Sequence, residues 1–486
     1  MLPSMDVNHA GFDLIAAARQ EMLDHGFVPD FPPAVARQLA SVDARPDPSL
    51  RDLRSLLWSS IDNDDSRDLD QIEWAERAGD HIRVLVAIAD VSATVFPDTP
   101  IDSYAALETT SVYTGVHTFP MLPERLSTDL TSLAEGQDRA AVVIDMTIAA
   151  DGSIATSSSY GALVRNQAQL TYSATGPWLE NSAAPPPKIA ASATLQQQLK
   201  LQDEAAQRLA DARHRHGALT FDRLEAEPVV KNGQVHDFTV RKHNRASQLI
   251  EDFMIAANEA MARALREARV SSIRRVVKDP ERWPRIVELA RQCGDQLPPA
   301  PDAAALNAFL VRRREADPVH YADISLAVLK LMGPGEYVVA RPGDPPQGHF
   351  GLAALDYTHS TAPNRRFADL VTQRLLKSAA AQSHPYTDEQ LEVIARNCTL
   401  KEDAARKVQR AMQKRLAAVA LQHRVGQMFS AVVTGVTPKG VFVRTLDPPV
   451  EGRVMRGERG LDVGDRIRVT LLSTDPQRGF IDFGRD

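Results

Sequence analysis

The chain has 486 residues, 43% of them hydrophobic, so it can bury a large core and we expect two or three domains. Its net charge of −7 argues against bulk electrostatic adhesion to nucleic acid, so any such binding needs locally basic walls. Cys293 and Cys398 lack the short paired spacing of a zinc or redox site. Because Met1–Gly11 has no signal-peptide core and no apolar stretch is long enough to span a membrane, we expect a soluble cytoplasmic protein.

Residues 1–48 are expected to form a helical segment. The first helix places Phe12, Ile15, Met22 and Leu23 on one face and stops at Gly26, and the second runs from Pro32-Pro33 to Val42. A proline-rich linker follows. Two helices joined by a turn are compatible with a helix-turn-helix that contacts nucleic acid or with a plain packing extension, and no basic recognition face is visible.

The densest cluster of carboxylates in the chain comes next. Five aspartates fall within nine residues: Asp62, Asp64, Asp65, Asp68 and Asp70. They are followed by an apolar, β-branched segment, His81 to Val95, which predicts a buried strand. Crowded like charges are unfavourable beside a core unless a cation neutralises them. Oxygen ligands without nearby Cys or His favour magnesium or manganese, whereas an isolated stretch of this kind would be a solvated acidic turn.

The rest of the chain divides into a large α/β region and a small β region. We expect the former over residues 49–422, with long loops at Asn181–Thr194 and Arg341–Gly348. Residues 423–486 contain five short alternating strands that fit an OB-type barrel. On that barrel, Phe442 is either a stacking platform for a base or a core residue.

Four segments, in this order, resemble the ribonuclease II / ribonuclease R (RNB) family. They are Ile61–Gln71 with Ile88–Ser92, Ser111–Ser127 with its Pro-Met-Leu-Pro, Ile250–Asn258, and His349–Asp369 with its paired arginines. The resemblance implies an α/β (α+β) RNB catalytic domain with a C-terminal five-stranded OB-type barrel that binds RNA. Family members commonly carry a pair of cold-shock barrels ahead of the catalytic domain, which fifty helical residues cannot hold, so we expect a short form.

By this resemblance the chain is a processive 3′-to-5′ hydrolytic exoribonuclease that degrades single-stranded RNA to nucleoside 5′-monophosphates. The implied cofactor is one or two Mg²⁺ or Mn²⁺ ions. We expect single-stranded RNA as the partner, no membrane, no organic cofactor and a monomer.

The family's four catalytic aspartates map onto Asp62, Asp68, Asp70 and position 71, where this chain has Gln71. The resemblance makes these four positions the metal ligands. An amide is a neutral oxygen ligand, so metal binding is expected to be weaker or to recruit Asp64 or Asp65.

The resemblance also assigns residues that contact RNA. Arg365 matches the arginine on the terminal phosphate, with an ion pair to Asp369 as its structural alternative, and Arg366 beside it is a second RNA-binding candidate. Tyr113 matches the tyrosine that stacks on the terminal base, and Phe221 the phenylalanine at the other end of the stacked bases. Three further acidic residues in matching segments are expected to orient ligands or helix termini: Asp90, Glu251 and Asp252.

Two departures inside the arginine segment are Asn364, where the family usually has Ile, and Ala362, where it usually has Ser. With Gln71, they leave two other hypotheses open. One is a catalytically weakened RNA-binding protein that keeps the channel and barrel. The other is a metal-dependent nuclease that prefers DNA or a structured RNA precursor.

Overall fold

A computed structural model describes residues 12–221, 225–231, 234–241, 243–317, 321–381, 383 and 385–485. The predicted absence of a signal peptide at Met1–Gly11 therefore concerns residues outside this range. Within it, no helix is both long enough and apolar enough to cross a membrane.

Two helices begin the described chain, as the sequence predicts: α1 (Leu14–Asp24) and α2 (Pro33–Ala40). Asp13 caps α1 by accepting the backbone N–H groups of Ile15 and Ala16. The predicted buried face of α1 was wrong in part. Ile15 and Leu23 are exposed, and Leu14, Ala18 and Met22 pack instead against the long helix α12 (Asp388–Leu421).

A six-stranded mixed sheet forms the centre of the large domain, with strand order β1-β8-β2-β3-β4-β7. Strand β8 pairs in parallel with β1 and β2. It also pairs in antiparallel fashion with β7 at the far edge, so the sheet closes on itself. The strands are β1 (Arg51–Asp52), β2 (Trp58–Asp62), β3 (Gln71–Ala78), β4 (His81–Ala89), β7 (Asp138–Ile148) and β8 (Ile154–Thr171). As predicted, β4 is almost entirely buried, which fits its run of β-branched and apolar residues.

Helices cover this sheet. Contacts to its strands come from α4 (Tyr172–Leu179), α6 (Ala193–Arg215) and α7 (Arg245–Glu267), which share one hydrophobic core with it. The stretch predicted as a loop at Asn181–Thr194 is only partly so, because α5 (Pro187–Ala190) lies within it and α6 begins at Ala193. The loop predicted at Arg341–Gly348 is confirmed.

The remaining elements surround this core. They are α3 (Pro100–Glu108), β5 (Val112–Tyr113), β6 (Thr118–Phe119), β9 (Glu225–Lys231), β10 (Gln234–Arg241), β11 (Ser272–Val276), α8 (Trp283–Gln292), α9 (Ala303–Ala316), α10 (Tyr321–Met332), β12 (Glu336–Ala340) and α11 (Phe367–Ala380). Short helical turns lie at Val91–Ala93, Leu126–Leu130, Phe350–Leu352 and Gln422–Arg424. Helices α8, α9 and α10 form a separate hydrophobic cluster.

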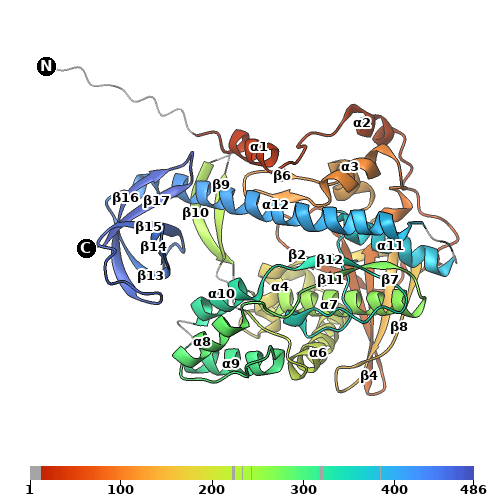
Figure 1. Cartoon of the computed structure of the whole chain (residues 1–486). Helices are drawn as coiled ribbons and strands as arrows, with labels where there is room; N and C mark the ends of the chain where they lie inside the picture. Colours follow the sequence, from red (N-terminus) through yellow and green to blue (C-terminus); the bar gives the residue numbers. More distant parts are fainter. Residues whose placement is uncertain are drawn as a thin grey trace.

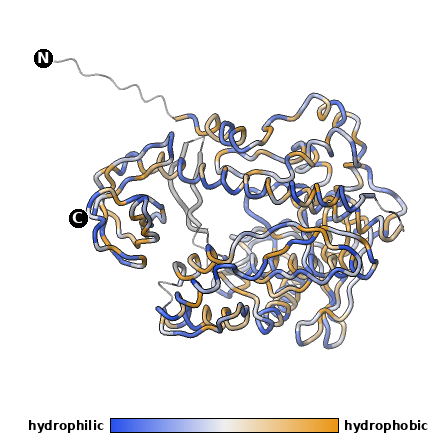
Figure 2. Tube along the Cα trace, viewed as in Figure 1, coloured by the Kyte–Doolittle hydropathy of each residue, from blue (hydrophilic) through white to orange (hydrophobic). Residues whose placement is uncertain are grey.

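The C-terminal strands close into a barrel of order β13-β14-β15-β17-β16, which confirms the predicted five-stranded barrel. They are β13 (Met428–Thr437), β14 (Gly440–Thr445), β15 (Glu451–Arg456), β16 (Arg466–Asp475) and β17 (Phe480–Arg485). Helix α12 runs across the molecule and joins the barrel to the large domain (Figure 1). Apolar and hydrophilic stretches alternate along it (Figure 2), as expected for a helix with one buried face.

Candidate active site

The acidic loop between β2 and β3 is held against the core by hydrogen bonds to its backbone. The Ser132 hydroxyl donates to the Arg67 carbonyl at 2.8 Å and accepts from the Leu69 N–H at 3.1 Å. The Leu69 carbonyl accepts from the N–H of Leu133, and the Asp70 carbonyl from that of Ala89, both at 2.9 Å. The loop therefore has a defined path, and its carboxylates are presented by a rigid frame.

Asp62, Asp68 and Asp70 form one electrostatic group. Burial raises the pKa of Asp68, and the charge of Asp62 adds to this effect. Asp70 is 2% exposed, and burial raises its pKa to about 7. The positive charge of Arg365 opposes this shift, and the negative charge of Asp68 adds to it. Asp62 itself accepts hydrogen bonds from the backbone of Asn63 at 2.7 Å and the hydroxyl of Ser66 at 2.9 Å.

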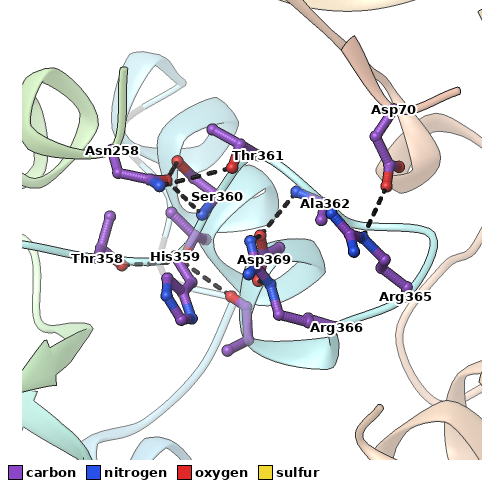
Figure 3. A network of polar contacts seen from close by, with 12 residues as sticks. Asp70, Asn258, Thr358, His359, Ser360, Thr361, Ala362, Arg365, Arg366 and Asp369 are labelled. Carbon is purple, nitrogen blue, oxygen red and sulfur yellow. Dashed lines mark hydrogen bonds and ion pairs between the residues drawn. The ribbon is translucent and has the colours of Figure 1, made fainter. Parts of the chain in front are cut away.

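Arg365 faces these carboxylates from the opposite side of the site. Its Nε lies 3.6 Å from Oδ2 of Asp70, and its side chain remains 48% exposed. Figure 3 shows the two side chains pointing toward one another across the loop that precedes α11. The guanidinium thus approaches the acidic group through Nε and keeps exposed surface for an anionic ligand.

The ion pair with Asp369 belongs to Arg366, not to Arg365. Nε and one terminal nitrogen of Arg366 donate to the two carboxylate oxygens of Asp369 at 2.8 and 2.7 Å (Figure 3). Asp369 is fully buried and also accepts the Ala362 N–H at 2.8 Å. The proposed structural alternative for Arg365 is therefore wrong, and the predicted RNA contact of Arg366 concerns a guanidinium already bound to a carboxylate.

Asn258 of helix α7 holds the start of the loop that carries Arg365 and Arg366. Oδ1 of Asn258 accepts the N–H and the hydroxyl of Ser360 at 2.9 and 2.7 Å. Its Nδ2 donates to the Tyr357 hydroxyl at 3.2 Å and lies at 3.5 Å from that of Thr361. Sequence reasoning placed Asn258 inside a matching segment but did not assign it this role.

Asn364, noted in the sequence only as a departure, contacts the acidic loop directly. It is 1% exposed, and its Nδ2 and backbone N–H donate to Oδ1 of Asp70 at 3.0 and 3.3 Å. Its Oδ1 accepts the Thr131 hydroxyl at 2.7 Å. An isoleucine at this position could make neither side-chain hydrogen bond.

Gln71, predicted as a metal ligand, lies buried at the start of β3. On the same strand Glu73 is fully buried, and within the described part of the chain neither carboxylate oxygen has a hydrogen-bond partner. Burial raises the pKa of Glu73 well above its usual range, and the charge of Asp62 raises it further. Glu73 was not singled out from the sequence, where it is one of two acidic residues in a strand of mixed polar and apolar residues.

Asp64 and Asp65, expected as possible substitutes for a metal ligand at position 71, are both on the surface. Asp64 is exposed and accepts the Ser173 hydroxyl at 2.5 Å, and Asp65 is exposed. Across the described ranges, no three His, Cys, Asp or Glu side chains already form a group that could hold a metal ion. The donor set nevertheless suits Mg²⁺, because this ion keeps several waters and takes few ligands from protein carboxylates.

The two candidate stacking residues lie in different parts of the molecule. Tyr113 is 41% exposed on β5, and partial burial raises its pKa to about 12, with the charges of Asp68 and Asp70 adding to the shift. Phe221 is partly buried against the cluster formed by α8, α9 and α10. On the barrel, Phe442 is half-buried and pairs with Arg453 on the neighbouring strand.

Asp90 and Asp252 contact other side chains or a helix terminus, in agreement with the expectation that they orient neighbouring groups. Asp90 caps the turn at Val91–Ala93 and forms an ion pair with Lys377 at 2.5 Å. Asp252 pairs with Arg213 on α6, and burial raises its pKa to about 7.

Comparison with known proteins places this site in a family. The model of the RNB domain matches residues 50–382, and that of the RNase II-type exonuclease C-terminal S1 domain matches residues 427–486. Ribonuclease R of Thermotoga maritima is 28% identical, over 93% of this chain and 68% of its own length. Ribonuclease R of Escherichia coli K12 is 30% identical, over 87% of this chain and 54% of its own length.

Solved structures show the same fold. Mycoplasma genitalium RNase R in complex with ribose-methylated single-stranded RNA superposes with a TM-score of 0.89 at 23% identity, covering 98% of this chain and 78% of that one. Yeast Ssd1, described as a pseudonuclease, gives a TM-score of 0.65 at 18% identity, covering 90% of this chain and 55% of that one. With the RNB match extending over most of the chain, this protein belongs to the RNB family and carries a C-terminal S1 domain of the RNase II type.

Proposed function

We propose that the chain is a 3′-to-5′ exoribonuclease that hydrolyses single-stranded RNA to nucleoside 5′-monophosphates with the help of Mg²⁺. The observation that carries this proposal is the opposition of Asp70 and Arg365, 3.6 Å apart, within the RNB frame. A carboxylate group suited to a cation and a half-exposed guanidinium suited to a phosphate are elements that metal-assisted phosphodiester hydrolysis uses.

Asp62, Asp68 and Asp70 would hold the cation, which when bound lowers the pKa of water and stabilises charge on phosphate oxygens. The loop contacts from Ser132, Leu133 and Ala89 keep the carboxylates in place without substrate. Burial is the main cause of the raised pKa values of Asp68 and Asp70, and a divalent cation at this site would favour their charged forms.

The chain's other residues would position the RNA. The exposed edge of the Arg365 guanidinium can donate two hydrogen bonds to a phosphate while Nε faces Asp70. Tyr113, next to both, offers an exposed ring on which a terminal base can stack irrespective of its identity. Gripping unpaired bases by their faces favours a single strand over a duplex.

A time course on single-stranded RNA tests the proposal, with 5′-labelled RNA to follow shortening from the 3′ end and uniformly labelled RNA to identify the released nucleotides. Wild-type protein and Asp70→Asn are compared with Mg²⁺ or with chelator, beside a DNA oligomer of the same sequence. We expect release of 5′-monophosphates from RNA alone, lost with chelator and in the variant. Retained RNA binding without products would contradict hydrolysis and favour the RNA-binding protein, whereas equal cleavage of DNA would contradict the RNA preference.

A further inference from the structure

Helix α1 packs in a hydrophobic cluster that is separate from the core of the central sheet. Met22 of α1 and Phe27 just after it belong to this cluster and are each 2% exposed. The C-terminal half of α12 contributes further members, and the hairpin of β5 and β6 contributes Val112 and Phe119. In Figure 1, α1 and β6 lie near one another along α12. The N-terminal helix therefore shares a core with the hairpin that carries Tyr113.

The pairing within the hairpin decides which of its side chains enter this cluster. Val112 pairs with Phe119, and Tyr113 pairs with Thr118. Side chains alternate along a strand, so the buried first pair faces the cluster and the exposed second pair faces away from it. Each strand has only two residues, and an isolated two-stranded hairpin is marginally stable in water. The position of the Tyr113 ring thus depends on how firmly Val112 and Phe119 are packed.

Backbone hydrogen bonds connect the start of the hairpin to the loop that carries Arg365. The N–H of Ser111 donates to the carbonyl oxygen of Arg365 at 3.0 Å, and the N–H of Phe367 donates to the carbonyl oxygen of Thr109 at 2.8 Å. These bonds precede the two strands, so the strands themselves rely on the hydrophobic cluster. Loosening the cluster would therefore displace the ring of Tyr113 relative to Arg365.

Polar contacts hold α1 on α12 at this cluster. Glu21 of α1 is 9% exposed and pairs with Arg415 of α12. After the helix, Nζ of Lys401 donates to the carbonyl oxygen of Gly26 at 2.7 Å and lies 4.4 Å from the centre of the Phe27 ring. The helix and the residues that follow it are thus fixed to α12 by charges as well as by apolar packing.

The same contacts weigh against a helix that binds nucleic acid. The apolar face of α1 is buried, and Arg19 is its one basic residue within Leu14–Asp24. The guanidinium of Arg19 forms an ion pair with Asp30. Attraction to phosphates needs several basic residues gathered on one face. Of the two alternatives for the N-terminal helices, packing is the one that these contacts support.

We propose that α1 is a positioning element for Tyr113, in which Met22 and Phe27 complete the cluster that holds the hairpin. They act through the hairpin and do not touch RNA. This inference rests on the proposed function, because it takes Tyr113 as the residue that stacks on the terminal base. It gives the N-terminal segment a role in setting the length of the shortest product.

Hydrogen–deuterium exchange of the RNA-free full chain tests the packing step. Met22→Ala removes side-chain volume from the cluster, so we expect exchange in the hairpin segment 110–121 to rise about tenfold or more. Met22→Leu has a similar volume and should exchange as wild type does. Ile189→Ala is the matched control, because Ile189 is fully buried in the core of the central sheet. It should lower Tm as Met22→Ala does, without faster exchange in the hairpin.

Digestion of single-stranded RNA tests the consequence for the site. The length of the shortest product should change in Met22→Ala in the same direction as in Tyr113→Ala. It should stay as in wild type in Met22→Leu and in Ile189→Ala. Adding Met22→Ala to Tyr113→Ala should cause no further change, because the ring through which α1 acts is already absent.

Four outcomes would overturn the proposal. They are unchanged hairpin exchange in Met22→Ala, an equal rise in Ile189→Ala, an unchanged product length despite faster exchange, and an additive change in the double variant. If Met22→Ala does not fold, Glu21→Gln decides, because it removes the charge that pairs with Arg415 and keeps the shape of the side chain. Faster hairpin exchange in Glu21→Gln supports the proposal, and unchanged exchange overturns it.

The exchange measurement separates this inference from the proposed function, because it needs no RNA. If hairpin exchange responds to Met22→Ala but wild-type protein releases no nucleotide, the exoribonuclease is contradicted and the packing of the hairpin by α1 stands. If wild-type protein degrades RNA but neither exchange nor product length responds to Met22→Ala, only the role of α1 is contradicted.

Discussion

Asn364 binds Asp70 through two donors, its side-chain amide at 3.0 Å and its backbone N–H at 3.3 Å, both to Oδ1. Because its Oδ1 accepts the Thr131 hydroxyl at 2.7 Å, the orientation of the amide is fixed and its nitrogen faces the carboxylate. The other oxygen, Oδ2, faces Arg365. Asn364 and Arg365 therefore divide the two oxygens of Asp70 between them.

Replacing Asn364 with leucine, which has a similar shape, should lower kcat about tenfold, because Asp70 loses a side-chain donor that orients it. We expect KM and the affinity for RNA to stay close to wild type, since Asn364 is buried. Single-turnover rates and RNA binding by fluorescence anisotropy measure the two effects. Thr131→Val should reproduce part of the loss and Thr131→Ser none; a loss of RNA affinity instead of rate would contradict this role.

Asp70 should make the cation-free protein less stable as pH rises. Its pKa is about 7 in the folded chain, against about 3.9 for an exposed aspartate, so the folded state binds the proton more tightly. Stability is then lost as pH increases through this interval and stays low above it, by on the order of 4 kcal/mol for this group.

Asp70→Asn removes the titrating group and keeps an acceptor for Asn364. In urea denaturation with chelator, we expect the stability of the variant to fall less than that of wild type between about pH 5 and about pH 8. The comparison with wild type cancels the contributions of other buried carboxylates. Identical pH dependence in the two proteins would show that Asp70 is not perturbed in this way.

Arg365→Lys should reduce kcat/KM for RNA cleavage by about 100-fold or more, because an ammonium cannot keep Asp70 and contact a phosphate with the geometry of a guanidinium. Arg312→Lys is a matched control, since Arg312 forms a surface ion pair with Asp295 at 2.8 Å. Steady-state cleavage of a short single-stranded RNA measures both variants. A similar small loss in both would assign Arg365 a general electrostatic effect rather than a specific contact.

Tyr113→Ala should change the length of the shortest product that remains at the end of digestion. The exposed ring offers a stacking surface worth about 1–3 kcal/mol per base, and without it the last nucleotides are held less well. Tyr113→Phe keeps the ring and should leave the product length unchanged. Separation of end products on a denaturing gel distinguishes the variants, and equal product lengths in all three proteins would exclude stacking at this position.

The local patterns in the sequence were sufficient for much of the fold and for the family. A run of β-branched and apolar residues predicted β4, alternation predicted the five barrel strands, and an apolar face, a glycine stop and a proline pair predicted α1 and α2, because these patterns depend on neighbours along the chain. The buried face of α1 was predicted only in part, since that face is chosen by its packing against α12, nearly 400 residues away.

The acidic loop and the arginine segment were also recognised from the sequence, but the partners within them were decided by tertiary structure. Asp70 and Asn364 are 294 positions apart, and only packing brings them to 3.0 Å. Adjacent Arg365 and Arg366 look equivalent in sequence, yet one faces Asp70 and the other binds Asp369, because successive residues leave the loop in different directions. Likewise, the sequence determines that Glu73 is an acid in a strand. That its carboxylate is buried, with no hydrogen-bond partner among the described residues, follows from the helices and strands packed around it.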